Sequence, residues 1–301
     1  MISDSCINQS YSLQGGLVYA INNFFSKSFF VNSTFSHATG DIDLFSLSNT
    51  DLTFENCYFF NNTNKMGIIM QSNITMINSK IIDHKGNLFF CYDTSHLRIL
   101  NSFFSQIQGG AEENMYLEES LMEIESSYFT DIENNKDASS ISSGVFSKYY
   151  IFNGTFINYK FNCFSISNSE FILNFSVFDN SNYSKSQNDK FGEFGTIFLE
   201  SCLKVQINYT VFVGNKNIIK GGSISIVSRA IFEEISEVLL TSNFFYQNKV
   251  NLFGGSVFLN IKIGEICTCN FTENFAQYGG AIYYNYDKSK SKNMIFLNYL
   301  I

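Results

Sequence analysis

The sequence predicts an all-β solenoid, a right-handed parallel β-helix of roughly 10–11 turns, from three observations. The first is a phrase that recurs three times: Phe212-x-x-Asn215 precedes Gly221-Gly222, Phe245-x-x-Asn248 precedes Gly254-Gly255, and Phe271-x-x-Asn274 precedes Gly279-Gly280. The second is a pair of apolar residues at a fixed distance before each Phe. The third is the absence of Pro from a chain with 34 Phe, because a stack of turns built on Gly and Asn does not need Pro.

The first element of each repeat is a short strand with one buried face. Apolar residues stand seven and five positions before the Phe, for example Leu52 and Phe54 before Phe59, or Val205 and Ile207 before Phe212. Alternation with period two indicates a strand that buries every second side chain. Each unit is too small to bury this face alone, so we expect the units to stack about 4.8 Å apart.

The second element is the anchor at the end of that pattern. Most anchors follow one another at 22 to 27 residues, and they are Phe35, Phe59, Ile81, Phe104, Phe129, Phe156, Phe178, Phe212, Phe245 and Phe271. We expect each anchor to stack on the anchor of the next turn. Asn often stands three positions before the anchor, as at Asn32, Asn56, Asn78, Asn101 and Asn153, where it suits a bend between strands.

The third element is the bend at the Gly pair, where the chain turns so tightly that side chains would collide. Three polar or lengthened stretches indicate loops that leave the solenoid, near residues 134–143, 181–190 and 229–237. A leucine-rich-repeat-like solenoid is the alternative fold, but Phe and Ile rather than Leu dominate the frame.

Composition limits the partners. The chain has 301 residues, 15% of them charged, with a formal net charge of −8. This argues against nucleic acid and against anionic membrane surfaces. Neither a signal peptide nor an apolar stretch long enough to span a bilayer stands out. We expect residues 1–301 to form one solenoid segment of a longer protein.

The phrase Phe-x-x-Asn followed by Gly-Gly-Ala-Ile, clearest between Phe212 and Ile282, resembles the repeat of polymorphic outer-membrane proteins and of large protist surface proteins. More broadly, it resembles the pectin-lyase-like right-handed β-helices. The resemblance implies a cell-surface or extracellular setting and an adhesive or scaffold role. It implies no cofactor, and any membrane association would come through regions outside this segment.

Enzymes with this kind of fold act on polysaccharides through clustered acids. The best pair is Asp41 and Asp43, which on a strand would share one face about 7 Å apart; solvent-facing positions beside an inward Ile42 explain them better. The run from Glu112 to Glu125 indicates a solvated acidic face, and the isolated histidines indicate no metal site. The seven cysteines are expected to be buried free thiols.

The preferred function is therefore a non-enzymatic surface or secreted scaffold or adhesin, which presents an elongated face to an unidentified protein or glycan. A polysaccharide lyase or hydrolase is the second hypothesis, and a passive spacer is the third. Asn182 is the best candidate for glycosylation because it lies on the 181–190 loop. The tyrosines Tyr149, Tyr150, Tyr283, Tyr284 and Tyr286 are candidates for an outward platform on which sugars stack.

Overall fold

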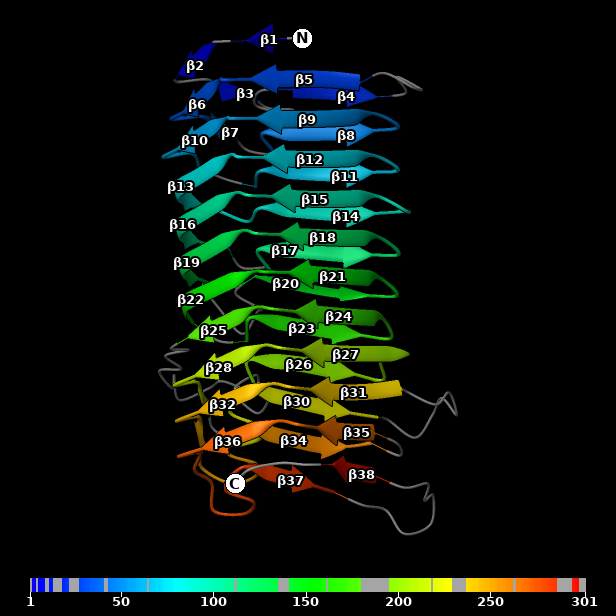
Figure 1. The fold of residues 1–301 in the computed structure, drawn as a ribbon. Helices are drawn as coiled ribbons and strands as arrows, with labels where there is room; N and C mark the ends of the chain where they lie inside the picture. Colours follow the sequence, from blue (N-terminus) through cyan, green and yellow to red (C-terminus); the bar gives the residue numbers. More distant parts are fainter. Residues whose placement is uncertain are drawn as a thin grey trace.

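The computed structural model is a right-handed parallel β-helix in which successive turns stack into a rod, with β1 at one end and β37 and β38 at the other (Figure 1). It describes residues 2–3, 5–8, 11–12, 18–21, 27–40, 43–63, 65–110, 113–134, 141–160, 162–179, 195–217, 219–228, 237–261, 264–285 and 294–297. These ranges contain strands and turns but no helix, so the predicted β-helix is confirmed and the leucine-rich-repeat alternative is not the fold.

Three long parallel sheets run the length of the rod. Sheet 1 consists of β1 (Ile2–Ser3), β5 (Lys27–Val31), β9 (Asp51–Glu55), β12 (Asn73–Ile77), β15 (His96–Leu100), β18 (Leu121–Glu125), β21 (Lys148–Phe152), β24 (Glu170–Asn174), β27 (Lys204–Asn208), β31 (Glu237–Thr241), β35 (Gly264–Cys267) and β38 (Met294–Leu297). Sheet 2 consists of β2 (Cys6–Asn8), β6 (Thr34–Ser36), β10 (Tyr58–Phe60), β13 (Lys80–Lys85), β16 (Phe103–Gln108), β19 (Tyr128–Glu133), β22 (Thr155–Tyr159), β25 (Val177–Asp179), β28 (Val211–Val213), β32 (Phe244–Tyr246) and β36 (Asn270–Thr272).

Sheet 3 closes each turn. It consists of β4 (Val18–Ile21), β8 (Phe45–Ser48), β11 (Gly67–Met70), β14 (Phe89–Tyr92), β17 (Met115–Glu118), β20 (Ser142–Val145), β23 (Phe164–Ser167), β26 (Ile197–Glu200), β30 (Ile224–Val227), β34 (Val257–Asn260) and β37 (Ile282–Tyr284). Two short pairs add to this frame, β3 (Tyr11–Ser12) with β7 (Thr39–Gly40), and β29 (Lys216–Asn217) with β33 (Lys249–Val250). The connections between sheets are named here the 1–2, 2–3 and 3–1 corners.

The predicted anchors form one continuous column in sheet 2. Every anchor from Phe35 to Phe271 pairs in register with the next, and Ile81 holds the one aliphatic position. The rings stack, with centroids 4.6 Å apart between Phe104 and Phe129 and 4.7 Å apart between Phe245 and Phe271. This spacing is that of neighbouring strands, so one buried ring per turn fills the interior along the rod.

The 1–2 corner is the same two-residue bend in each described turn. Its first residue has a positive φ, and this holds for Asn32, Asn56, Asn78, Asn101 and Asn153, where a bend was predicted, because Asn tolerates the left-handed region better than most residues. The second residue is buried and small, and it bridges the turns. The Ser79 hydroxyl, for example, accepts from the Cys57 amide at 3.1 Å, and the Ser102 hydroxyl accepts from the Ser79 amide at 3.1 Å.

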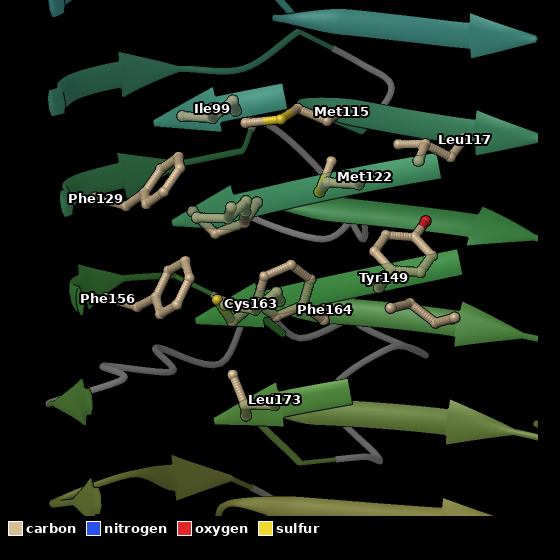
Figure 2. Packing of buried hydrophobic residues seen from close by; sticks show 14 of the residues in the cluster. Ile99, Met115, Leu117, Met122, Phe129, Tyr149, Phe156, Cys163, Phe164 and Leu173 are labelled. Carbon is tan, nitrogen blue, oxygen red and sulfur yellow. The ribbon is translucent and has the colours of Figure 1, made fainter. Parts of the chain in front are cut away.

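Side chains from all three sheets meet in the interior (Figure 2). Phe129 and Phe156 of sheet 2 stack with centroids 5.2 Å apart, and Phe164 of sheet 3 meets Phe156 edge to face at 5.4 Å. Tyr149 lies among these apolar residues and is fully buried, and its hydroxyl donates to the Ser143 carbonyl at 3.0 Å. The prediction that Tyr149 faces outward is therefore wrong.

Candidate functional site

The Asn residues of the recurring phrase form a buried ladder at the 2–3 corner. The Asn248 amide donates to the Phe212 carbonyl at 3.0 Å and to Asn274 Oδ1 at 3.0 Å. The Asn215 amide makes the same contacts one turn earlier, with the Phe178 carbonyl at 3.3 Å and Asn248 Oδ1 at 3.0 Å. Each Asn thus ties its turn to the anchor of the preceding turn, which explains the fixed spacing of Phe and Asn in the sequence.

The Gly pairs complete this corner for two separate reasons. The first Gly of each pair lies in the left-handed region, with φ of 52° at Gly221, 66° at Gly254 and 64° at Gly279. The second Gly is needed where turns approach closely, because a Cβ on Gly222 would collide with the Gly255 carbonyl and a Cβ on Gly255 with the Gly280 carbonyl. The phrase is therefore structural.

Earlier turns fill the position of the ladder in other ways. Asn62 repeats the phrase and donates to the Phe35 carbonyl at 3.1 Å. The equivalent position is then occupied by His84, Ile107, Ile132 and Tyr159. The Tyr159 hydroxyl donates to Asn215 Oδ1 at 2.7 Å, so it joins this part of the column to the Asn ladder.

Of the two candidate catalytic acids, only Asp43 lies within the described residues; Asp41 lies outside them. Asp43 precedes β8, and its side chain is buried, with 3% of the residue exposed. The expectation that Asp43 faces solvent is wrong, because the segment before β8 turns this side chain inward. The structure thus gives no arrangement of the two carboxylates relative to each other.

Several outward carboxylates pair with cations on neighbouring strands. The pairs are Glu123 Oε2 with Arg98 Nε at 3.0 Å, Glu170 Oε1 with Lys148 Nζ at 3.3 Å, and Glu133 Oε2 with Lys160 Nζ at 2.6 Å. Across the described ranges, no three side chains of His, Cys, Asp or Glu come together as a metal site. In the predicted acidic run, Glu118, Glu119 and Glu125 are exposed, and Glu112 lies outside the described residues.

The cysteines offer no activated nucleophile among the six whose side chains are described. Five are buried free thiols, as predicted, namely Cys57, Cys91, Cys163, Cys202 and Cys269. Burial raises the pKa of the Cys202 thiol to about 12. Cys267 is less buried, and its thiol donates to Glu265 Oε1 at 2.7 Å; this hydrogen bond, with a smaller effect of burial, raises its pKa to about 11. Because the thiolate is the reactive form, these groups are unreactive at neutral pH.

A ladder of exposed aromatic side chains lies at the 1–2 corner, and the sequence reasoning missed it. Phe152, Phe175 and Tyr209 are 47%, 50% and 54% exposed. The centroid of the Phe175 ring lies 5.3 Å from that of Phe152 and 4.9 Å from that of Tyr209. We call these three residues the aromatic ladder. A signal was available, since Phe175 and Tyr209 stand three residues before their anchors, where five other turns have Asn.

The remaining predicted platform tyrosines that the structure describes, Tyr150, Tyr283 and Tyr284, do not form one surface. Tyr150 is half-buried on the outer face of β21. Tyr283 stacks on the buried Phe258 with centroids 5.7 Å apart, and Tyr284 donates to the Ile261 carbonyl at 3.2 Å. Tyr286 lies outside the described residues. The exposed aromatic side chains that stack in mid-rod are thus those of the aromatic ladder.

The predicted loops fall largely outside the described ranges. This holds for residues 135–140, 180–194 and 229–236, and so for Asn182. The first loop ends before β20, which begins at Ser142, and the third ends before β31, which begins at Glu237. In chain order, the first two stretches connect sheet 2 to sheet 3, and the third connects sheet 3 to sheet 1. The short 1–2 corner, which carries the aromatic ladder, has no insertion in the described turns.

No helix in the described ranges is both long and apolar enough to cross a membrane. No family model matches the chain, and no curated protein matches it. Among solved structures, a GH87 alpha-1,3-glucanase catalytic domain in complex with tetrasaccharides is similar with a TM-score of 0.42 and 8% identity, over 90% of this chain and 64% of that one. A GH87 catalytic domain in complex with nigerose gives 0.39 and 9%, over 90% and 63%.

The surface protein and adhesin PfbA of Streptococcus pneumoniae gives a TM-score of 0.31 and 10% identity, over 88% of this chain and 91% of that one. The chain spans less than two-thirds of the length of the two glucanase domains. The neighbours thus include both glycosidase domains and an adhesin, and they do not decide between the two functions.

Proposed function

We propose that this chain is a non-enzymatic scaffold or adhesin of the cell surface or the extracellular space, whose elongated outer face binds a protein or glycan partner. The observation that carries the proposal is the aromatic ladder. Phe175 and Tyr209 keep a backbone conformation with φ of 52° and 51°, which costs of order 1 kcal/mol for such residues, while half of each side chain stays in water. Folding alone does not call for aromatic rings at these positions.

The charges of the outer face favour binding over catalysis. Glu123, Glu133 and Glu170 each pair with a cation of a neighbouring turn, so these carboxylates are engaged in ion pairs along the rod. General acid and base catalysis needs carboxyl groups that reach the substrate. The aromatic ladder instead offers apolar rings, beside the amides of Asn174 and Asn208, and these groups bind without reacting.

The repeat itself supports a surface setting. Its Phe, Asn and Gly residues are used for stacking turns, which leaves the outer face free to vary. The phrase also resembles the repeat of polymorphic outer-membrane proteins and, more broadly, the pectin-lyase-like β-helices, which implies such a setting. Loops at the 2–3 and 3–1 corners, including Asn182 as a glycosylation site, would add to the binding surface. Attachment to a membrane would come through regions outside this segment.

A carbohydrate-active enzyme is the second candidate, and Asp43 is the observation that favours it, because a buried carboxyl group is typical of catalytic sites. Its 3% exposure also counts against a role in direct contact with a polymer, which must reach the carboxyl oxygens. If the chain degrades a polysaccharide through these acids, the Asp43→Asn and Asp41→Asn variants will each lose that activity.

The test is to immobilise the purified chain and pass over it a panel of polysaccharides and extracellular-matrix proteins, measuring both retention and new reducing ends. We expect at least one component to be retained and recovered intact. Shortened polysaccharide chains would establish the enzyme instead. Retention of nothing in the panel, by the wild type and by a variant lacking residues 181–190 alike, would leave the passive spacer.

A further inference from the structure

We propose that the aromatic ladder, together with the amides of Asn174 and Asn208, is a binding site for a neutral glycan chain. This inference rests on the proposed function and names the chemistry of its partner. It is carried by the position of the rings, by the groups beside them and by the area they expose.

The ladder ends abruptly, so that a ring face is left uncovered. In the next turn, the place of Tyr209 is taken by Ser242, whose amide donates to the Cys267 carbonyl as the Tyr209 amide does to Thr241. The small Ser242 side chain lies 2.8 Å, oxygen to oxygen, from the Thr268 hydroxyl. Above these two hydroxyls, the Tyr209 ring has no further ring stacked on it among the described residues. A flat apolar group of a ligand can therefore stack on the Tyr209 ring, one turn spacing (about 4.8 Å) further along the rod.

The amides beside the rings add hydrogen-bonding groups that face the same way. Asn174 and Asn208 directly precede Phe175 and Tyr209 and point outward from sheet 1. The Asn208 Nδ2 donates to Asn174 Oδ1 at 2.9 Å, which uses one donor and one acceptor of the pair. In the part of the chain that is described, both side-chain N–H groups of Asn174 and the Asn208 side-chain oxygen make no hydrogen bond, so they are available to hydroxyl groups.

A sugar ring matches this combination of groups. The C–H bonds on one side of a pyranose are weakly positive and pack against the negative face of an aromatic ring, while the hydroxyls at its edge bond to amides. Most outward side chains that border the ladder are uncharged: Tyr150, Ile172 and Gln206 on sheet 1, and Thr155, Val177 and Val211 on sheet 2. The charged neighbour is Glu125, an exposed carboxylate that pairs with Phe152 in sheet 1 and would repel an anionic sugar. With no cation at hand for a carboxylate or sulfate, the site favours a neutral sugar over an acidic one.

The exposed area argues for a glycan rather than a folded protein. An aromatic side chain offers roughly 150–250 Å² of surface, so three half-exposed rings present on the order of 300 Å². A stable protein interface needs about 800 Å² on each partner. The ladder instead spans two turn spacings, or about 10 Å, which is the size of a short oligosaccharide.

The Asn residues that other turns carry at this position of the 1–2 corner suggest the variant for the test. Replacing Phe175 and Tyr209 together by Asn introduces the residue that five other turns carry at this φ, so the double variant Phe175→Asn/Tyr209→Asn is expected to fold, with a melting temperature within about 4 °C of the wild type. The matched control is Phe146→Asn. Phe146 is also exposed, at 62%, and also has a positive φ of 51°, but it lies at the 3–1 corner, away from the ladder.

The probes are neutral hexasaccharides (of glucose in α-1,4 and β-1,4 linkage, of xylose and of mannose) and, for contrast, a hexamer of galacturonic acid. Binding is measured by calorimetry, on protein made in bacteria so that the sequons at Asn174 and Asn208 carry no sugar. We expect one or more neutral probes to bind the wild type and the Phe146→Asn control equally, and to bind the double variant at least about tenfold more weakly, a difference of 1.4 kcal/mol.

Two results would overturn the inference. One is that no neutral probe binds the wild type, whether or not the galacturonic acid hexamer binds. The other is that a neutral probe binds the double variant as tightly as the wild type. If either result occurs while the immobilised chain still retains a matrix protein or another polysaccharide, the proposed function stands and only the neutral-glycan site fails. Retention of nothing would remove both.

Discussion

The turns from Phe212 to Ile282 and the turns from Ile81 to Tyr159 share one column of anchors but build the 2–3 corner with different chemistry. The later turns use the buried Asn ladder and the Gly pairs, while the earlier ones place His84, Ile107, Ile132 or Tyr159 at the ladder position. The strand register continues unbroken through both regions. Stacked anchors are therefore what the fold requires, whereas Asn and Gly-Gly are one solution for closing a corner.

The largest loss of stability is expected from a single added methyl group at a Gly pair of the later turns. Gly255→Ala would drive a Cβ into the Gly280 carbonyl, and we expect a loss of about 4 kcal/mol or more in the free energy of unfolding, an exceptional value for one substitution. Urea unfolding followed by circular dichroism measures it. Gly280→Ala is the control, because its Cβ would lie 3.5 Å from the nearest carbonyl oxygen, that of Asn274. Equal stabilities of the two variants would refute the close-approach explanation.

The anchors should behave alike in both regions. Phe156→Ala and Phe245→Ala each remove a fully buried ring from the column, and we expect each to lower the free energy of unfolding by about 3–5 kcal/mol. The same urea titrations give both values. A loss at one anchor below about 1 kcal/mol would mean that the column is not a common requirement of the two regions.

Substitutions at the position of the buried Asn ladder, at the 2–3 corner, should change the stability by different amounts in the two regions. Asn248→Leu leaves the Phe212 carbonyl and the Asn215 amide without their partner, and we expect a loss of about 2–3 kcal/mol. Ile132→Leu changes an apolar side chain at the equivalent position, and it should cost less than about 1.5 kcal/mol. A neutral Asn248→Leu would show that the hydrogen bonds of the ladder contribute no net stability.

The smallest effect is expected at the 1–2 corner, which both regions build alike. Cys57→Ser places at this buried position the residue that its neighbours Ser33 and Ser79 already provide. The Cys57 thiol donates to the Phe30 carbonyl at 3.3 Å, and a hydroxyl can make the same bond. We expect a change within about 1 kcal/mol by thermal and urea unfolding. A loss well above this would mean that thiol volume, rather than hydrogen bonding, holds the corner.

The fold could be predicted from the sequence because the same spacing of Phe, apolar and Asn residues repeats along the chain. The spacing of Phe and of the apolar pair before it gave the sheets, and the Asn three residues earlier gave the 1–2 corner. The same spacing places Tyr149 inward, seven residues before Phe156. The spacing does not predict which residues meet across sheets. Tyr149 fits in the interior because Gly144, where a Cβ would collide with the Tyr149 hydroxyl, leaves room for it.

The candidate site was harder to predict for a related reason. Asp43 carries no sign of burial in its local pattern, because the turn of the chain before β8 decides where it points. The aromatic ladder appears in the sequence only as two exceptions in a column of Asn, at Phe175 and Tyr209. Their exposure, their stacking on each other and the edge-to-face contact of Phe175 with Phe152 become visible only when three successive turns are placed side by side.

We propose that this β-helix binds its partner without altering it. The most direct measurement is to incubate the wild-type chain with a neutral polysaccharide that it retains, recover the complex, and determine the chain length of the bound polymer by size-exclusion chromatography. We predict that the polymer is recovered at its full length. Progressive shortening, abolished in Asp43→Asn but unchanged in Phe146→Asn, would contradict this account and show that the protein is an enzyme.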